Sequence, residues 1–177
     1  MNKFIMKYKN NLIITMLFII IACVVNITLA FLLERIINIV QLGNFKEFYK
    51  MVSVIITFIL LDATVNYIRN YSQCIYIKKT MYYIKNKVFE NILEKNTFDF
   101  YSNNSAKYIS IISNDLKMVE DDYINNIFFI FENIILFIGS LISLFILNYE
   151  LTIILILMSL FTFIIPKVFE ENFRRIF

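Results

Sequence analysis

NNLIITMLFIIIACVVNITLAFLL, residues 10–33, carries no charged side chain. About 20 apolar residues in a helix are enough to cross the hydrocarbon core of a bilayer. This run is long enough to be a span, and it is too long for the apolar segment of a secretion signal. The whole chain shares the bias, because 59% of its 177 residues are hydrophobic and 18% are charged, and the mean hydropathy is +0.69. The sequence therefore predicts an all-α membrane protein.

Three further apolar stretches follow the first one and are separated from it by polar or turn-forming residues. Gly43 supplies a turn residue after the first stretch, and residues 147–150 supply a turn between the last two. The sequence predicts four transmembrane helices in total, at about 11–38, 48–72, 127–147 and 151–170.

The distribution of positive charge predicts the orientation of the chain. With the N-terminus inside the cell, only Arg35, Lys46 and Lys50 of the 17 Lys and Arg residues fall outside. Cytoplasmic loops carry an excess of Lys and Arg, so we expect a multi-pass protein of the cell membrane with a cytoplasmic N-terminus. The net charge of +3 then reflects orientation in the lipid bilayer, and no nucleic-acid partner is expected.

Residues 73–126 are predicted to form an ordered intracellular loop. No Gly or Pro occurs between Asn44 and Ile138, so nothing obvious breaks a helix there. A helix over about 48–95 would be roughly 70 Å long at 1.5 Å per residue, roughly 40 Å more than the hydrocarbon core. Both arms of the loop repeat apolar residues at helical spacing: Met81, Ile84, Val88 and Ile92, and then Ile109, Ile112, Leu116, Val119, Tyr123, Ile127 and Ile130. We therefore expect long cytoplasmic helical extensions with packed faces.

FDFYSNNSAKYISIISNDLKMVEDDY, residues 98–123, resembles the first intracellular loop of ABC exporters with the six-span exporter fold. In that family, two aromatic residues and a short polar stretch precede a Gly-Glu-Leu-Ile-Ser-Arg-Ile-Ser-Asn-Asp-Val pattern. The residues that match this pattern in register are Ile109, Ser110, Ile112, Ser113, Asn114, Asp115 and Leu116, whereas Ile111 stands where the family usually has Arg. LFIGSLISLFILNYELTIILILMSL, residues 136–160, is similar to the family's third span, outer turn and fourth span. The resemblance covers essentially the whole chain and implies the N-terminal part of an exporter transmembrane domain.

The resemblance also implies a coupling helix at about 96–103, which in such exporters rests in a groove of the ATPase domain. The residues implied at this contact are Phe98, Asp99, Phe100, Tyr101 and Asp115. Aromatic side chains at an exposed tip supply interface area. The alternative for the aromatic residues is a plain helical hairpin that buries them on itself, and the alternative for the aspartate at 115 is a solvated helix face.

Asp62 lies near the middle of a predicted span. Intramembrane carboxylates are costly and usually face a cavity or a polar partner. Asp62 and Asn66 are therefore candidates for lining a substrate cavity or for forming a structural pair. Asn26, Thr28 or a span outside this chain are the other candidate partners of Asp62.

Arg69 and Glu132 lie at similar predicted depths in adjacent spans, so we expect them to pair. The two cysteines, Cys23 and Cys74, are interpreted as packing thiols. The chain has no His, and no metal site is expected.

Nucleotide chemistry is expected to lie outside this chain. A phosphate loop requires a G-x-x-x-x-G-K-[ST] pattern, whereas the 2 Gly of the chain, at positions 43 and 139, lie too far apart to form one. We expect no catalytic residue, no ATP-binding residue and no cofactor here. The resemblance implies that ATP and Mg²⁺ act through an ABC ATPase domain, and that a second exporter half completes a homo- or heterodimer. On this reading the chain is an N-terminal fragment or one piece of a split exporter.

Two alternatives remain open from the sequence. One is a complete small four-span membrane protein, such as an immunity or accessory factor without transport activity. The other is a membrane sensor whose long helices signal to a cytoplasmic effector.

Overall fold

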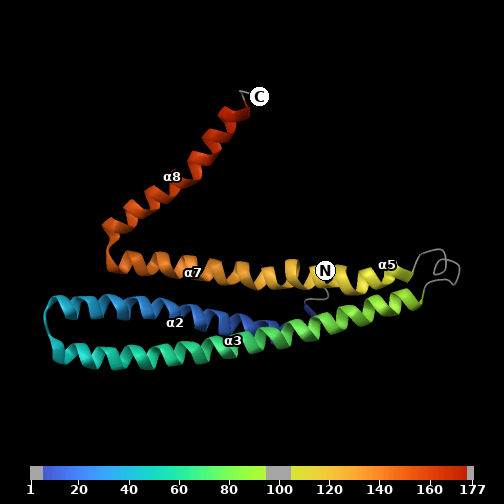
Figure 1. The fold of residues 1–177 in the computed structure, drawn as a ribbon, viewed down its shortest axis with the longest axis horizontal. Coiled ribbons are helices and arrows are strands. Elements are labelled where there is room, and N and C mark those ends of the chain that lie inside the picture. The colour runs from blue at the N-terminus through green and yellow to red at the C-terminus, as the bar shows by residue number, and fades with distance from the viewer. Residues whose placement is uncertain (1–5, 95–104, 175–177) are drawn as a thin grey trace. The chain divides into compact units, whose positions relative to one another are not determined.

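The computed structural model describes residues 6–94 and 105–174, which consist of helices joined by short turns, without strands. The chain divides into two compact units, Met1–Ile135 and Leu136–Phe177. In the first unit a short η1 (Met6–Tyr8) leads into α2 (Lys9–Gln41), and a tight turn joins α2 to α3 (Phe45–Leu93). Figure 1 shows α2 and α3 side by side as a long antiparallel hairpin.

Two residues, Gly43 and Asn44, have separate roles in the turn between α2 and α3. Gly43 adopts a positive φ of 68°, a conformation that glycine reaches without steric penalty. Its amide donates to the Val40 carbonyl at 3.1 Å and so satisfies one of the free carbonyls at the end of α2. Asn44 then caps α3, because its Oδ1 accepts a hydrogen bond from the Glu47 amide at 3.4 Å. Local chemistry therefore fixes the turn that the sequence predicted near Gly43.

The seam of the hairpin is lined by small and medium-sized side chains on α2. Thr15, Ile19 and Ala22 are almost fully buried, and small residues let neighbouring helices approach closely. Thr15 Oγ1 and Ser72 Oγ lie 3.0 Å apart and share a hydrogen bond. These two residues are almost equidistant from Gly43 along the chain, so this contact sets the register of the two helices.

The helix α3 has 49 residues without interruption. At 1.5 Å per residue it is roughly 73 Å long, more than twice the hydrocarbon thickness of a bilayer. The expected continuous helix is therefore confirmed. Along its second half Met81 and Ile92 are buried, as the predicted packed face requires.

The returning arm is one continuous helical path, but it is not a regular α-helix. It consists of α5 (Ser105–Ser110), the π-helical η2 (Ile111–Asp115), α6 (Leu116–Met118), the π-helical η3 (Val119–Asn125) and α7 (Asn126–Leu147). A π-helix closes i→i+5 hydrogen bonds, so each turn holds more residues than an α-turn. The helical phase therefore changes along the arm.

This change of phase alters which face of the returning arm is packed. The buried residues are Tyr108, Leu116, Ile124 and Phe128, all separated by multiples of four. Ile109 and Ile130, which the α-helical period placed on the packed face, are 66% and 57% exposed. The predicted stripe is thus correct at Leu116 and wrong at Ile109 and Ile130, because a single α-helical period does not hold across the π-helical η2 and η3.

The second unit contains the end of α7 and all of α8 (Tyr149–Arg174). Asn148 caps α8, since its Oδ1 accepts from the amides of Glu150 and Leu151 at 3.0 and 3.1 Å. Three helical stretches of the described chain are long and apolar enough to cross a membrane: Met6–Gln41, Phe45–Leu93 and Tyr108–Leu147. The apolar described part of α8, Tyr149–Ser159, is shorter. The fold is that of an all-α membrane domain, as the sequence predicted.

Candidate functional site

The first unit contains two polar pairs within its predicted spans, and one of them is local. Asn66 Nδ2 donates to Asp62 Oδ1 at 3.0 Å and to the Asp62 carbonyl oxygen at 3.0 Å. Both residues are half-buried. Of the candidate partners of Asp62 within the chain, the structure shows Asn66, one turn along the same helix, in contact with it. Asn26 and Thr28 instead donate to carbonyls of their own helix, α2.

The second pair joins two helices. Arg69 on α3 forms an ion pair and hydrogen bond with Glu132 on α7 through Nη1 and Oε1, which confirms the predicted pairing. The arginine also donates from Nη2 to Asn70 Oδ1 at 3.0 Å. Their side chains keep 17% and 27% of their surface exposed, so the pair is shielded but not sealed from its surroundings.

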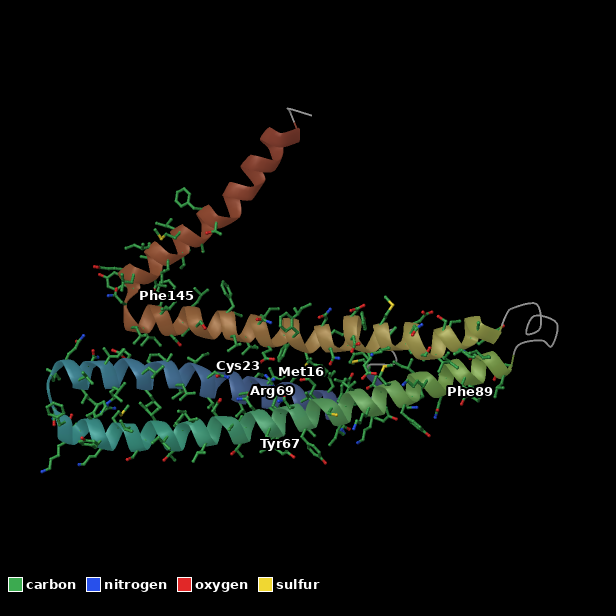
Figure 2. All side chains as sticks on the ribbon, in the orientation of Figure 1. Met16, Cys23, Tyr67, Arg69, Phe89 and Phe145 are labelled. Atoms are coloured by element: carbon green, nitrogen blue, oxygen red, sulfur yellow. The ribbon has the colours of Figure 1, made fainter. Side chains whose placement is uncertain are left out.

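Cys23 on α2 lies next to the pair of Arg69 and Glu132. Its Sγ lies 4.0 Å from the Glu132 carbonyl oxygen and donates a weak hydrogen bond to it, and the residue is buried. Figure 2 shows Cys23 and Arg69 at neighbouring positions along α2 and α3. Three helices thus meet around one polar cluster, which we call the Arg69 cluster (Cys23, Arg69, Asn70 and Glu132).

An aromatic contact extends the packing from the Arg69 cluster toward the Leu93 end of α3. Tyr76 and Phe128 are both 1% exposed, and their rings pack edge to face with centroids 5.4 Å apart. Such geometry suits the quadrupoles of the two rings. About two turns further along α3, Lys7 lies over the Tyr83 ring, 3.3 Å from its centroid, and so holds η1 against α3.

The residues implied at the coupling contact are mostly outside the described part of the chain. Phe98, Asp99, Phe100 and Tyr101 fall in the undescribed range 95–104, as does the whole of the expected coupling helix at 96–103. Asp115 is described: it ends η2 and is exposed. An exposed Asp115 is consistent with both alternatives, a contact with a partner and a solvated helix face.

A pocket of about 250 Å³ lies between α3 and η3, and the sequence analysis missed it. It is lined by Asn70, Gln73, Cys74, Ile77, Lys78 and Glu120. Spacings of three and four residues place the first five on one face of α3, so the polar stripe was visible in the sequence. What the sequence did not reveal is that the π-helical η3 brings Glu120 to the same place.

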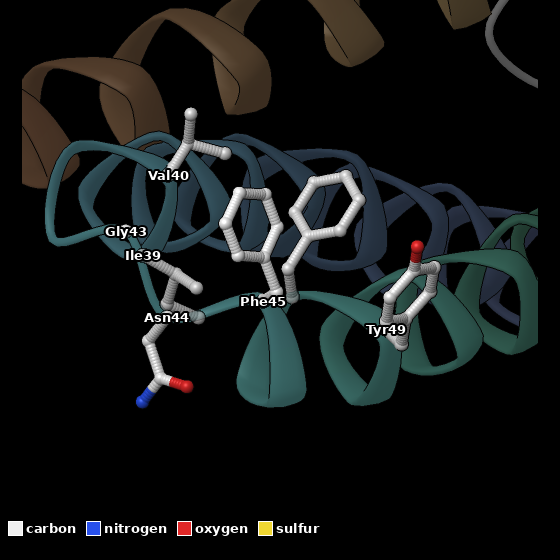
Figure 3. Close-up of a pocket in the computed structure, with 7 residues that line it drawn as sticks. Ile39, Val40, Gly43, Asn44, Phe45 and Tyr49 are labelled. Atoms are coloured by element: carbon white, nitrogen blue, oxygen red, sulfur yellow. The ribbon is translucent and has the colours of Figure 1, made fainter.

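A second pocket, of about 280 Å³, lies at the turn between α2 and α3. It is lined by Ile39, Val40, Gly43, Asn44, Phe45, Phe48 and Tyr49. Figure 3 shows the aromatic rings of Phe45 and Tyr49 along its α3 side. Its lining is mainly apolar, so it offers little chemistry beyond hydrophobic contact.

Three helical stretches long and apolar enough to cross a membrane, one of them within a helix of 49 residues, define an all-α membrane domain. The chain matches the family model of the ABC transporter transmembrane region over residues 12–177. It therefore belongs to that family and is a membrane-embedded transport component. No curated protein matches the chain.

Proposed function

We propose that this chain is the transmembrane, or permease, part of an ATP-driven exporter of the cell membrane. In this role α2, α3 and α7, with α8 as a fourth span, form part of the substrate path. The tip near residues 96–103 transmits the motion of an ABC ATPase domain, which supplies the site for ATP and Mg²⁺. The N-terminus is cytoplasmic, and a second exporter half, identical or different, completes the path.

One observation carries the proposal beyond family membership, namely the pair of long helical arms. The helix α3 continues from the predicted end of its span near residue 72 to Leu93, roughly 30 Å at 1.5 Å per residue. The path from Ser105 to Asn125 returns over a similar distance. Paired rigid helices of this length are suited to carry a displacement from their tip to the membrane, whereas a short loop would absorb it.

Contacts between neighbouring helices hold the two arms at both of their ends. The Arg69 cluster ties α3 to α7 and α2 at the level of the membrane. Tyr76 packs on Phe128 just beyond it, and the buried Ile92 and Tyr108 lie close to the tip. A push on the tip is therefore resisted by packed contacts along both arms.

Asp62 fits a role on the substrate path. Among the described side chains, the Asp62 carboxylate accepts a hydrogen bond from Asn66 of its own helix and from no side chain of a neighbouring helix. A half-buried carboxylate held only by its own helix is suited to meet a cationic or hydrogen-bonding group of a substrate.

The experiment that tests the coupling role replaces Phe98, Phe100 and Tyr101 by Ala. Interface anchors contribute about 1–3 kcal/mol each, so even about 2 kcal/mol in total weakens binding of the ATPase domain roughly thirtyfold. The measurement is the affinity of the chain in nanodiscs for its ATPase domain, together with thermal unfolding in detergent. We expect weaker binding with nearly unchanged unfolding.

Phe89 provides the matched control, because it is an aromatic residue on the α3 arm that is 53% exposed. Replacing Phe89 by Ala should leave both ATPase binding and unfolding unchanged. If the triple variant instead unfolds at a much lower temperature, the aromatic residues belong to the core of the hairpin, and the coupling role is wrong.

A further inference from the structure

We propose that the pocket between α3 and η3 binds the headgroup of a zwitterionic phospholipid that carries a primary ammonium group. We call it the headgroup pocket and define it by Asn70, Gln73, Cys74, Ile77, Lys78 and Glu120. The site goes beyond the proposed function, because it requires membrane embedding but neither export nor an ATPase partner.

The charges of the headgroup pocket match such a headgroup. Lys78 and Glu120 carry opposite charges and line the same cavity of about 250 Å³. The ion pairs among the described side chains are Arg69–Glu132 and Lys87–Glu90, so Lys78 and Glu120 do not neutralise each other. An ammonium donates charge-assisted hydrogen bonds to a carboxylate, and a phosphodiester accepts them from a lysine.

Neutral side chains complete the headgroup pocket. The amides of Asn70 and Gln73 lie on the same face of α3 and offer further donors for phosphate oxygens. Cys74 and Ile77 supply apolar wall. A site with one cation, one anion and two amides is balanced for a ligand of zero net charge, and an anionic ligand would meet repulsion from Glu120.

The depth of the headgroup pocket selects a lipid over a soluble ligand. The predicted span of α3 ends near residue 72, and Lys78 lies about 9 Å further along the helix at 1.5 Å per residue. The polar headgroup layer of a bilayer extends roughly 5–8 Å beyond the hydrocarbon core on each side. The pocket therefore begins at the edge of the hydrocarbon and extends across the layer that phospholipid headgroups occupy.

The local backbone gives an independent reason to regard this place as a site. Glu120 is the second residue of the π-helical η3 (Val119–Asn125), which packs against α3. π-Helical turns are rare and are found frequently at functional sites. Here the altered helical phase turns Glu120 toward α3, while its neighbour Asp121 is exposed.

The chain contains its own reporter for occupancy of the headgroup pocket. Of its two cysteines, Cys74 lines the pocket and is exposed, whereas Cys23 is buried. The rate at which N-ethylmaleimide modifies Cys74 therefore measures how open the pocket is. The comparison is between nanodiscs of phosphatidylethanolamine with phosphatidylcholine and nanodiscs of phosphatidylcholine alone, which have the same net charge.

We expect the ethanolamine lipid to slow modification of Cys74 by about tenfold, the factor that 1.4 kcal/mol of binding free energy gives. A quaternary choline has no N–H to donate to Glu120, so phosphatidylcholine should protect far less. Equal rates in the two kinds of nanodisc would overturn the proposal.

Two variants and two matched controls assign the effect to the headgroup pocket. Glu120→Gln should abolish the difference between the two lipids, and Lys78→Gln should reduce protection by both. Lys79→Gln and Asp121→Asn change adjacent exposed residues that do not line the pocket and should behave as the unaltered chain. If the controls alter protection as strongly as the pocket variants, surface charge explains the effect and the proposal is wrong.

A final arm separates the lipid from a soluble ligand of the same chemistry. Glycerophosphoethanolamine, added to the chain in phosphatidylcholine nanodiscs at the concentration of the lipid headgroup, should leave the rate at Cys74 unchanged. Protection by this soluble headgroup equal to that of the lipid would overturn the assignment to a bilayer lipid. Thermal unfolding of each variant should stay within a few degrees of the unaltered chain, since Lys78 is exposed and forms no ion pair with the other described side chains.

Discussion

Asp62 and Arg69 lie about two turns apart on α3, and the fold satisfies their charges in opposite ways. Asp62 is held by Asn66 of its own helix, so its interaction survives any movement of the neighbouring helices. Arg69 is held by Glu132 of α7, so its interaction depends on the position of that helix. One residue has a local partner and the other has a tertiary partner.

This difference shows how one helix can carry both a charge that is paired with a neighbouring helix and a charge that is paired only within the helix itself. A charged group inside a membrane needs a partner, and a tertiary partner fixes the packing of helices. A partner on the same helix fixes no contact between that part of the helix surface and a neighbouring helix. The Arg69 cluster therefore belongs to the framework of the fold, whereas the hydrogen bond between Asp62 and Asn66 joins no neighbouring helix and suits the proposed role on the substrate path.

The largest effect is expected when the tertiary pair is broken. Arg69→Leu leaves the Glu132 carboxylate shielded and unpaired, and removing one partner of a buried pair typically costs about 3–5 kcal/mol. Because the two side chains keep 17% and 27% of their surface exposed, we expect about 3 kcal/mol, the lower end of that range. The measurement is unfolding of the purified chain in mixed micelles by titration with a denaturing detergent.

The control for this prediction removes both charges together. The double variant Arg69→Leu with Glu132→Leu buries no unpaired charge, and such replacements are often neutral, so it should recover most of the lost free energy of unfolding. A double variant as unstable as Arg69→Leu alone would show that the arginine acts through packing rather than through its charge.

A smaller change in stability is expected from the local pair. Asp62→Asn keeps the shape of the side chain and an oxygen that accepts from Asn66, so the free energy of unfolding should change by less than about 1 kcal/mol. On the proposed function, transport by the assembled exporter should nevertheless fall, because the charge that we propose for the substrate path is lost. The free energy of unfolding is measured in mixed micelles. Transport by the same variant is measured as substrate uptake into inverted vesicles.

The matched control for this comparison is Asn66→Ala, which removes the partner and keeps the carboxylate. We expect transport to be retained to a larger extent than in Asp62→Asn. If Asp62→Asn destabilises the chain as much as Arg69→Leu does, then Asp62 is also part of the framework, and the contrast between the two pairs is wrong.

Much of this fold could be predicted from the sequence, because apolar runs of bilayer length and the absence of helix breakers act locally. The turn at Gly43, the uninterrupted α3 and the pairing of Arg69 with Glu132 were all anticipated for that reason. The pairing required one additional step, which was to place two charges at equal depth in adjacent spans.

The phase of the returning arm could not be predicted in the same way. Nothing in the residues of η2 and η3 signals i→i+5 hydrogen bonds, and a phase change places the residues before it and after it on different faces relative to one another. The packed face was therefore predicted wrongly at Ile109 and Ile130. The headgroup pocket was missed for the same reason, since it depends on where η3 places Glu120.

The smallest effect is expected at the neutral tertiary contact between α2 and α3. Thr15 is fully buried, and its hydroxyl lies 3.0 Å from Ser72 Oγ and donates to the Asn11 carbonyl at 2.9 Å. Thr15→Val keeps the branched shape and removes the hydroxyl. Hydrogen bonds between membrane helices contribute about 0.6 kcal/mol on average, so we expect a loss of that size in the free energy of unfolding.

A double-mutant cycle with Ser72→Ala measures the coupling between the two hydroxyl groups directly. We expect a coupling energy of about 0.6 kcal/mol, far below the coupling of the charged pair measured in the same way between Arg69→Leu and Glu132→Leu. The order of these two energies sharpens the comparison, because both contacts join α3 to a neighbouring helix and differ chiefly in charge. If the Thr15–Ser72 coupling equals that of the ion pair, the hairpin seam holds the framework as firmly as the Arg69 cluster does, and charge is not what distinguishes them.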